Sequence, residues 1–182
     1  KHCAPPFTSR SRSYLPVCSW FFAEDILRKI VYVHLLNDFS GSPKVLKDVI
    51  STSSYRPGEA CLYVGSGTKG FLTDAAVDTR NFWYFRSKIK LLTLFSYVIS
   101  QLLLLAKLLC DRSIGKDTII YVNTLLPFGA GIFGWIRGLK VVYHVHEVSI
   151  SPLLLRHFLI FVVNASSRFN IDVSHAHTAA LP

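Results

Sequence analysis

Leu139–Ser151 reads Leu-Lys-Val-Val-Tyr-His-Val-His-Glu-Val-Ser-Ile-Ser, and this stretch indicates both the fold and the place of its chemistry. Its first half is β-branched and aromatic, which is typical of a buried strand. His144, His146 and Glu147 follow, and the serines and proline after them are typical of a helix start. Ligands of an open parallel sheet bind beyond the carboxyl ends of its strands. The sequence therefore predicts a ligand-binding site between the end of this strand and the start of the next helix.

Apolar strand patterns and helical patterns alternate along the rest of the chain. Strands are predicted at Ile30–Leu36, Ala60–Val64, Asn81–Phe85, Asp117–Val122, Lys140–Val145 and Asn170–Val173. Helices are predicted at Lys44–Ile50, Ser87–Cys110, Gly129–Arg137 and Pro152–Asn164. This alternation predicts an α/β fold, an open parallel sheet with right-handed crossovers and helices on both faces.

The composition narrows the class of protein. The chain has 182 residues, 51% hydrophobic and 17% charged, so it can bury one domain core and is not disordered by composition. Its formal net charge of +9 favours an anionic partner, such as a phosphorylated substrate or an acidic lipid surface. Nucleic acid would also suit the charge, but no aromatic-basic motif supports it, and we expect no nucleic-acid binding.

The four cysteines form no C-x-x-C pair, so we expect reduced cytosolic thiols rather than a zinc site or a disulfide framework. Residues 1–28 are rich in proline, serine and arginine, and we expect a poorly ordered basic extension ahead of one domain over residues 29–182.

Ser87–Cys110 is the most hydrophobic segment of the chain. Its uninterrupted apolar run is shorter than the roughly 20 residues that span a bilayer. We therefore expect a helix buried between the sheet and a neighbouring element. The alternative is a helix lying in a membrane surface, with Lys88, Lys90 and Lys107 at the lipid headgroups.

Two glycine-containing turns follow predicted strands. Asn37–Pro43 contains Gly41 and leads into a helix, so its backbone N–H groups would favour a phosphate or a hydroxyl-rich ligand. A tight turn also needs glycine for steric reasons alone, and this interpretation stays open. Gly65–Gly70 is followed by Phe71 where a Walker motif needs Lys and then Ser or Thr, so we expect an ordinary loop there.

His144 and His146 are two residues apart and would face the same side of a strand. A metal ion would need a third ligand, and no suitable residue lies close to these two histidines in the sequence. We therefore expect no metal site. One interpretation is a buried histidine satisfied by the backbone beside a second histidine at the surface. The other is a donor to a sugar hydroxyl or phosphate, with His146 favoured and Glu147 orienting it or binding a hydroxyl.

The order of these features resembles the N-terminal, acceptor-side half of a GT-B fold glycosyltransferase of the GT4-like type. The resemblance spans about residues 29–182. The stretches that carry it are Ile30–Leu36 with the turn Phe39–Pro43, Asp117–Asn123, the small-residue helix Gly129–Gly138, Val141–Glu147 and Phe169–His175.

The resemblance implies a Rossmann-like domain that faces a second Rossmann-like domain across a cleft and supports retaining transfer without a metal. It implies catalytic roles for His146 and Glu147, His146 contacting the transferred sugar. It also implies substrate binding by Ser40, Gly41, Ser42, Asn123, His144 and Ser174, with Gly41 and Ser42 near the donor phosphate and the acceptor.

The resemblance further implies a nucleotide-sugar donor, a glycan or lipid-linked acceptor and no cofactor. The family's second domain, with paired glutamates and most nucleotide contacts, is absent from this sequence, so we expect the chain alone to be inactive or nearly so. We expect a cytoplasmic protein, peripheral at the inner, acidic face of a membrane. The alternative is a non-catalytic membrane-associated or binding protein on a Rossmann-like scaffold.

Overall fold

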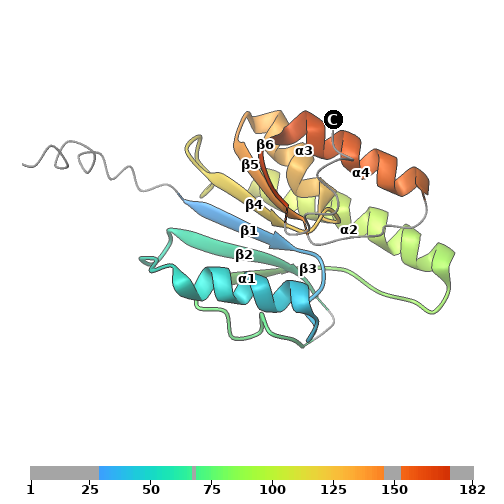
Figure 1. Cartoon of the computed structure of the whole chain (residues 1–182), viewed down its shortest axis with the longest axis horizontal. Helices are drawn as coiled ribbons and strands as arrows, with labels where there is room; N and C mark the ends of the chain where they lie inside the picture. Colours follow the sequence, from blue (N-terminus) through green and yellow to red (C-terminus); the bar gives the residue numbers. More distant parts are fainter. Residues whose placement is uncertain (1–28, 67–68, 146–152, 173–182) are drawn as a thin grey trace, which may run out of the picture.

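A computed structural model describes residues 29–66, 69–145 and 153–172 of the chain and shows an α/β fold (Figure 1). Its elements, in chain order, are β1 (Ile30–His34), α1 (Gly41–Thr52), β2 (Ala60–Gly65), β3 (Asp78–Phe82), α2 (Lys90–Cys110), β4 (Ile119–Asn123), α3 (Phe128–Arg137), β5 (Lys140–Val145), α4 (Leu153–Ser166) and β6 (Ser167–Asp172). The predicted extension at 1–28 lies outside the described residues.

All the strand pairings are parallel, and the sheet order is β3-β2-β1-β4-β5-β6. β2 and β3 are added on one side of β1. The chain then returns through α2, and β4 pairs with the other side of β1. β1 and β4 therefore flank the point at which the strand order reverses, where open α/β sheets bind ligands. This order confirms the predicted open parallel sheet and makes it Rossmann-like.

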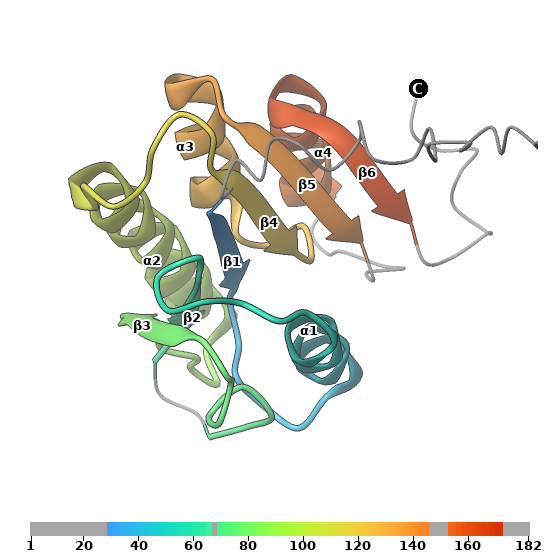
Figure 2. The same ribbon diagram turned by 90° about the vertical axis from the view of Figure 1, so that its left-hand side faces the viewer.

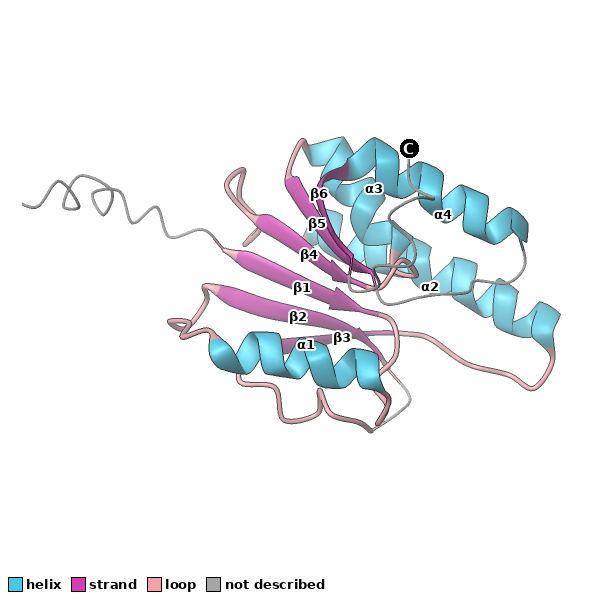
Figure 3. Ribbon diagram, in the orientation of Figure 1, coloured by secondary structure: helices cyan, strands magenta, loops and turns pink. Residues whose placement is uncertain are grey.

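The helices cover both faces of the sheet, as predicted (Figures 2 and 3). α1 covers one face, where Leu46 and Ile50 pack against Tyr32 of β1 and Leu62 of β2. α2, α3 and α4 cover the other face, over a larger core that includes Val33, Val122 and Tyr143 from the strands. The strands are apolar on both sides because both of their faces are buried in this way.

Glycines let α3 approach its neighbours closely. A Cβ on Gly129 would lie 2.5 Å from the backbone oxygen of Gln101 in α2, and a Cβ on Gly134 would lie 2.2 Å from Val141 Cγ2 in β5. The N–H of Gly129 donates to Gln101 Oε1 at 3.1 Å. The backbones of α2 and α3 therefore touch at a point where any side chain would hold them apart.

The position of β3 differs from the sequence prediction. The strand covers Asp78–Phe82 and pairs with β2 from Cys61 to Gly65, whereas the aromatic run Asn81–Phe85 had been predicted. β3 is an edge strand, and an edge strand tolerates polar residues such as Asp78 and Arg80 that obscure an apolar pattern. The other predicted strands and helices are confirmed, with shifts of a few residues at their ends.

α2 is a helix, as predicted, but its expected burial between two layers is wrong. Its inner face is buried through Ser96, Tyr97, Ser100, Gln101, Leu104 and Leu108. On its outer face, Leu91 is 76% exposed and Phe95 is 63% exposed. The described residues supply no second layer there, so hydrophobicity alone did not indicate burial.

We predict that Gly129→Ala lowers the free energy of unfolding by about 1–3 kcal/mol, because the new methyl group must push α3 away from α2. The control is Gly115→Ala, since a Cβ on the exposed Gly115 meets nothing within 4 Å. Urea denaturation should show a change of less than about 0.5 kcal/mol for the control. Equal midpoints for the two variants would contradict this close contact.

Candidate functional site

The carboxyl ends of β1 and β4 are joined by hydrogen bonds to the start of α1. The side-chain amide of Asn123, the last residue of β4, donates to the backbone oxygen of Ser42 at 3.0 Å and to Ser42 Oγ at 3.1 Å. His34, the last residue of β1, places Nδ1 3.1 Å from the backbone oxygen of Asn123 and 3.2 Å from its amide nitrogen. Asn123 is fully buried, so these contacts fix three segments at the reversal point.

The tautomer of His34 decides which of its two contacts with Asn123 is a hydrogen bond. With a proton on Nδ1, the ring donates to the backbone oxygen of Asn123. Without that proton, Nδ1 accepts from the Asn123 amide. A ligand that donated to or accepted from the His34 ring would therefore shift the hydrogen bonding of Asn123 as well.

His144 extends this polar edge to β5, directly beside Asn123 in the strand register. Its Nδ1 lies 2.6 Å from the hydroxyl of Tyr121. Burial and, secondarily, the nearby Tyr55 raise the pKa of Tyr121 to about 12, so the phenol keeps its proton at neutral pH. When this phenol donates to Nδ1, the proton of neutral His144 is on Nε2.

Thr124, directly after β4, has an unusual backbone conformation. Its φ is +81°, the only positive φ of a non-glycine residue in the described chain, and β-branched residues strongly disfavour this region. Thr124 is 4% exposed, and its hydroxyl has no hydrogen-bond partner among the described residues. Its N–H donates to the backbone oxygen of His144 at 2.8 Å. Strain and an unsatisfied buried hydroxyl at one residue are typical of a binding site.

We call His34, Ser42, Asn123, Thr124 and His144 the switch-point cluster. Three of its members, Ser42, Asn123 and His144, are substrate-binding residues predicted from the sequence, and the fold brings them to one edge of the sheet.

The remaining site residues predicted from the sequence lie either at the exposed start of α1 or outside the described residues. Ser40 and Gly41 lie exposed at the start of α1, and the hydroxyl of Ser40 donates to Asp38 Oδ1 at 2.5 Å instead of capping the helix. His146, Glu147 and Ser174 lie outside the described residues, so their roles remain predictions.

His34 and Thr124 belong to the cluster but were not predicted as site residues. A signal was available for His34, because it is a histidine two residues before the end of the predicted strand Ile30–Leu36. Thr124 had none, because a positive φ is rare for threonine and depends on contacts between β4 and β5. Within the described residues, no three His, Cys, Asp or Glu side chains gather as a metal ion would require.

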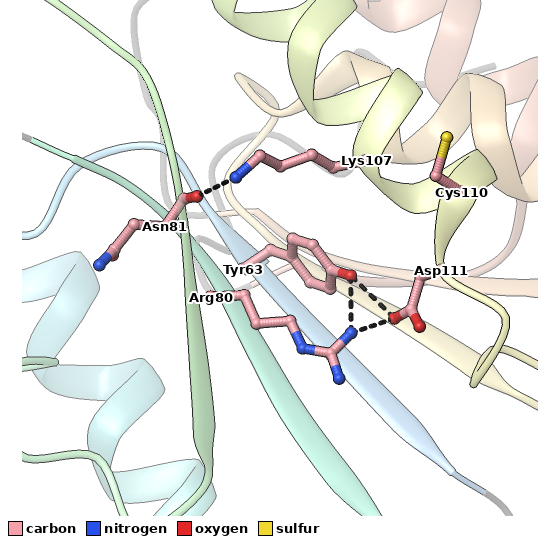
Figure 4. A pocket seen from close by; sticks show the side chains of 6 residues that line it. All are labelled: Tyr63, Arg80, Asn81, Lys107, Cys110 and Asp111. Atoms are coloured by element: carbon pink, nitrogen blue, oxygen red, sulfur yellow. Dashed lines mark hydrogen bonds and ion pairs between the residues drawn. The ribbon is translucent and has the colours of Figure 1, made fainter.

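A pocket lies away from this edge, between β2, β3 and the end of α2 (Figure 4). Its lining residues are Tyr63, Arg80, Asn81, Lys107, Cys110 and Asp111. The Tyr63 hydroxyl donates to Asp111 Oδ2 at 2.8 Å, and Arg80 forms an ion pair with the same carboxylate. Lys107 Nζ donates to the backbone oxygen of Asn81 at 2.6 Å. Arg80 and Asp111 neutralise each other and Lys107 bonds to the backbone of β3, so these contacts hold the end of α2 against the edge strand.

The contacts of the Asp111 carboxylate with Tyr63 and Arg80 are sensitive to acid. Desolvation works to raise the pKa of Asp111, but hydrogen bonds from Ser113 and Tyr63 and the charge of Arg80 outweigh it and hold the pKa at about 2. The pKa is therefore lower in the folded chain than its ordinary value of 3.8. Such a carboxylate stabilises the fold fully above pH 3.8, and the stabilisation is lost as the pH falls to about 2.

We predict that Asp111→Asn destabilises the chain at neutral pH and removes this part of its acid sensitivity. The wild-type midpoint in urea should fall between pH 4 and pH 2 more steeply than the variant's midpoint. The exposed Asp117→Asn serves as the control and should keep the wild-type profile. Parallel profiles for wild type and Asp111→Asn would contradict the assigned fastening role.

We predict that Thr124→Gly stabilises the fold by about 1 kcal/mol, because relief of backbone strain and loss of the unsatisfied hydroxyl outweigh the added flexibility of glycine. Thr79→Gly in β3 is the matched control, and it should destabilise the chain by about 1 kcal/mol because glycine weakens a strand. Urea denaturation measures both. Similar losses in the two variants would show that Thr124 is not strained.

Comparison with known proteins adds no relative: no protein family, curated protein or solved structure matches this chain. The fold itself is Rossmann-like, from the parallel strand order and the helices packed alongside it. The chemistry of the switch-point cluster is therefore the basis for assigning a function.

Proposed function

We propose that this chain is the acceptor-side domain of a retaining glycosyltransferase, which moves a sugar from a nucleotide-sugar to a glycan or lipid-linked acceptor. The observation that carries the proposal is the switch-point cluster, which gathers hydroxyl, amide and imidazole groups at the reversal point of the sheet. These groups suit a ligand rich in hydroxyls and phosphate oxygens.

The start of α1 would add to the binding of the donor phosphate. Its first turn contains no acidic residue, and no side chain caps its first N–H groups. Ser40 and Gly41 are exposed there, beside the partly buried contact of Ser42 with Asn123. Free N–H groups at a helix start attract anions, so a leaving diphosphate would be stabilised as its charge grows.

Thr124 supports a role in holding the sugar or the acceptor. Its buried hydroxyl can donate one hydrogen bond to a ligand and can also accept one from it. Because this hydroxyl is already shielded from water, binding would cost no further desolvation of it. His146 follows β5 by one residue in the sequence, and we propose that it contacts the transferred sugar, with Glu147 orienting it or binding a hydroxyl.

The proposed reaction needs both walls of a two-domain cleft. Nucleophilic attack by an acceptor hydroxyl on the anomeric carbon requires donor and acceptor to be fixed together, and most donor contacts would come from a second domain. This chain alone should therefore turn over nucleotide-sugars slowly or not at all.

We predict that the polypeptide encoded by the complete reading frame releases UDP or GDP from a nucleotide-sugar, and that His146→Ala lowers this rate by about 10²-fold or more. His157→Ala is the matched control, since His157 is exposed on α4 and its Nδ1 lies 2.8 Å from the backbone oxygen of Leu153. The control should keep the wild-type rate.

Thr124→Val extends this test to the switch-point cluster, because valine keeps the branched shape and removes the hydroxyl. A raised KM would support ligand binding by Thr124. If turnover is unchanged by His146→Ala, the assignment as a glycosyltransferase would stand, but His146 would have no role in its active site. No turnover of any nucleotide-sugar would favour the binding-protein alternative and reject the proposed function.

A further inference from the structure

The outer face of α2 is more apolar than is usual for a helix that faces water, and its buried face mixes polar and apolar side chains. Its buried face contains Ser96, whose hydroxyl accepts the N–H of Phe85 at 3.1 Å, and Gln101, which accepts the N–H of Gly129. Its outer face is apolar, with Leu91, Phe95 and other large side chains exposed. A surface of this kind needs an apolar partner outside the described fold.

α4 also begins with exposed apolar side chains. Leu153 and Leu154 lie in the first turn of α4, and Leu154 is 82% exposed. Aromatic rings link the helices beneath: Tyr97 contacts Phe128 at 5.6 Å between centroids, and Phe128 contacts Phe158 at 5.2 Å. Both α2 and α4 begin at the end of the molecule where the strands end (Figure 1). We call Phe85, Ile89, Leu91, Phe95, Leu153 and Leu154 the apolar rim.

The charged residues within the three helices α2, α3 and α4 are all positive. α2, α3 and α4 contain no Asp or Glu, and their charged residues are Lys90, Lys107, Arg137 and Arg156. Arg86 and Lys88, both exposed, directly precede α2. Cations at a helix start oppose the helix dipole, and α2 has neither an acidic first turn nor a side-chain cap to offset them. An external layer of anions would stabilise this arrangement.

We propose that the apolar rim docks on an anionic lipid surface. The rim's side chains would enter the boundary between headgroups and acyl chains, and the cations at the start of α2 would meet lipid phosphates. The occupant suggested by this charge pattern is a lipid surface, because a second copy of the chain would bring its own Lys88 and Lys90 against like charges.

α2 would lie on the membrane rather than cross it. Its 21 residues are long and apolar enough to span a bilayer, but its inner face is held to α3 by the buried Gln101 contact and to the β3–α2 segment by Ser96. Crossing would break these hydrogen bonds and leave their polar groups in hydrocarbon. The inference does not depend on the proposed glycosyl transfer, because lipid binding is measured without turnover.

The test is co-sedimentation of the full chain with phosphatidylcholine vesicles, with and without phosphatidylglycerol. We expect strong binding only with phosphatidylglycerol, weakening as salt is raised. Leu91→Ser combined with Phe95→Ser should lower the affinity at least about tenfold, because both side chains leave the apolar contact. Lys88→Glu combined with Lys90→Glu should do the same, because lipid phosphates then meet negative charge.

Two controls match these variants. Lys44→Glu combined with Lys47→Glu makes the same charge change on α1, on the opposite face of the sheet. Ile136→Ser removes an exposed apolar side chain at the far end of α3. Each control should change the affinity by less than about threefold, since screening confines charge effects to about 10 Å at ordinary ionic strength. All the substituted side chains except Lys47 are exposed, and urea midpoints check that each variant folds.

Three results would overturn the proposal. One is vesicle binding that the rim variants leave unchanged. Another is a lipid-free dimer that Leu91→Ser with Phe95→Ser dissociates, which would make a second copy the occupant. The third is absence of vesicle binding by the polypeptide from the complete reading frame, which would mean that another segment of protein covers the rim.

Discussion

The switch-point cluster depends on the buried side-chain amide of Asn123. It joins β4 to the first turn of α1 through Ser42 and approaches His34 at the end of β1. Each such hydrogen bond contributes about 1 kcal/mol net, but a buried acceptor left unpaired costs about 1–3 kcal/mol. The amide therefore fixes which polar groups face a ligand where the strand order reverses.

The two faces of the sheet serve different purposes around this edge. α1 is a single helix with a mixed charge pattern, and its first turn is hydrogen-bonded to the switch-point cluster through Ser42. The layer of α2, α3 and α4 is close-packed through Gly129 and Gly134, yet its outer surface is apolar and basic. In our proposals, the face covered by α1 supports a ligand-binding site, and the face covered by α2, α3 and α4 supports a contact with lipid.

Much of the architecture was predictable because strand and helix periodicities are local properties of the chain. The parallel sheet and the positions of most elements followed from apolar runs and what comes after them. That Ser42, Asn123 and His144 belong together was implied by the family resemblance rather than by these runs. β3 was misplaced because edge strands are polar. The strain at Thr124 left no trace in the sequence, since it arises from contacts between strands that are distant along the chain.

By itself the sequence determined that this protein is an open parallel α/β sheet with polar residues at the carboxyl ends of its strands. Burial of apolar runs leaves little choice of fold once strands and helices alternate. Only the tertiary structure decided that Thr124 is strained, with a hydroxyl that has no partner among the described residues, and that α2 turns Leu91 and several other leucines outward. Both depend on which neighbours each side chain meets, and packing between distant segments, rather than local pattern, sets those neighbours.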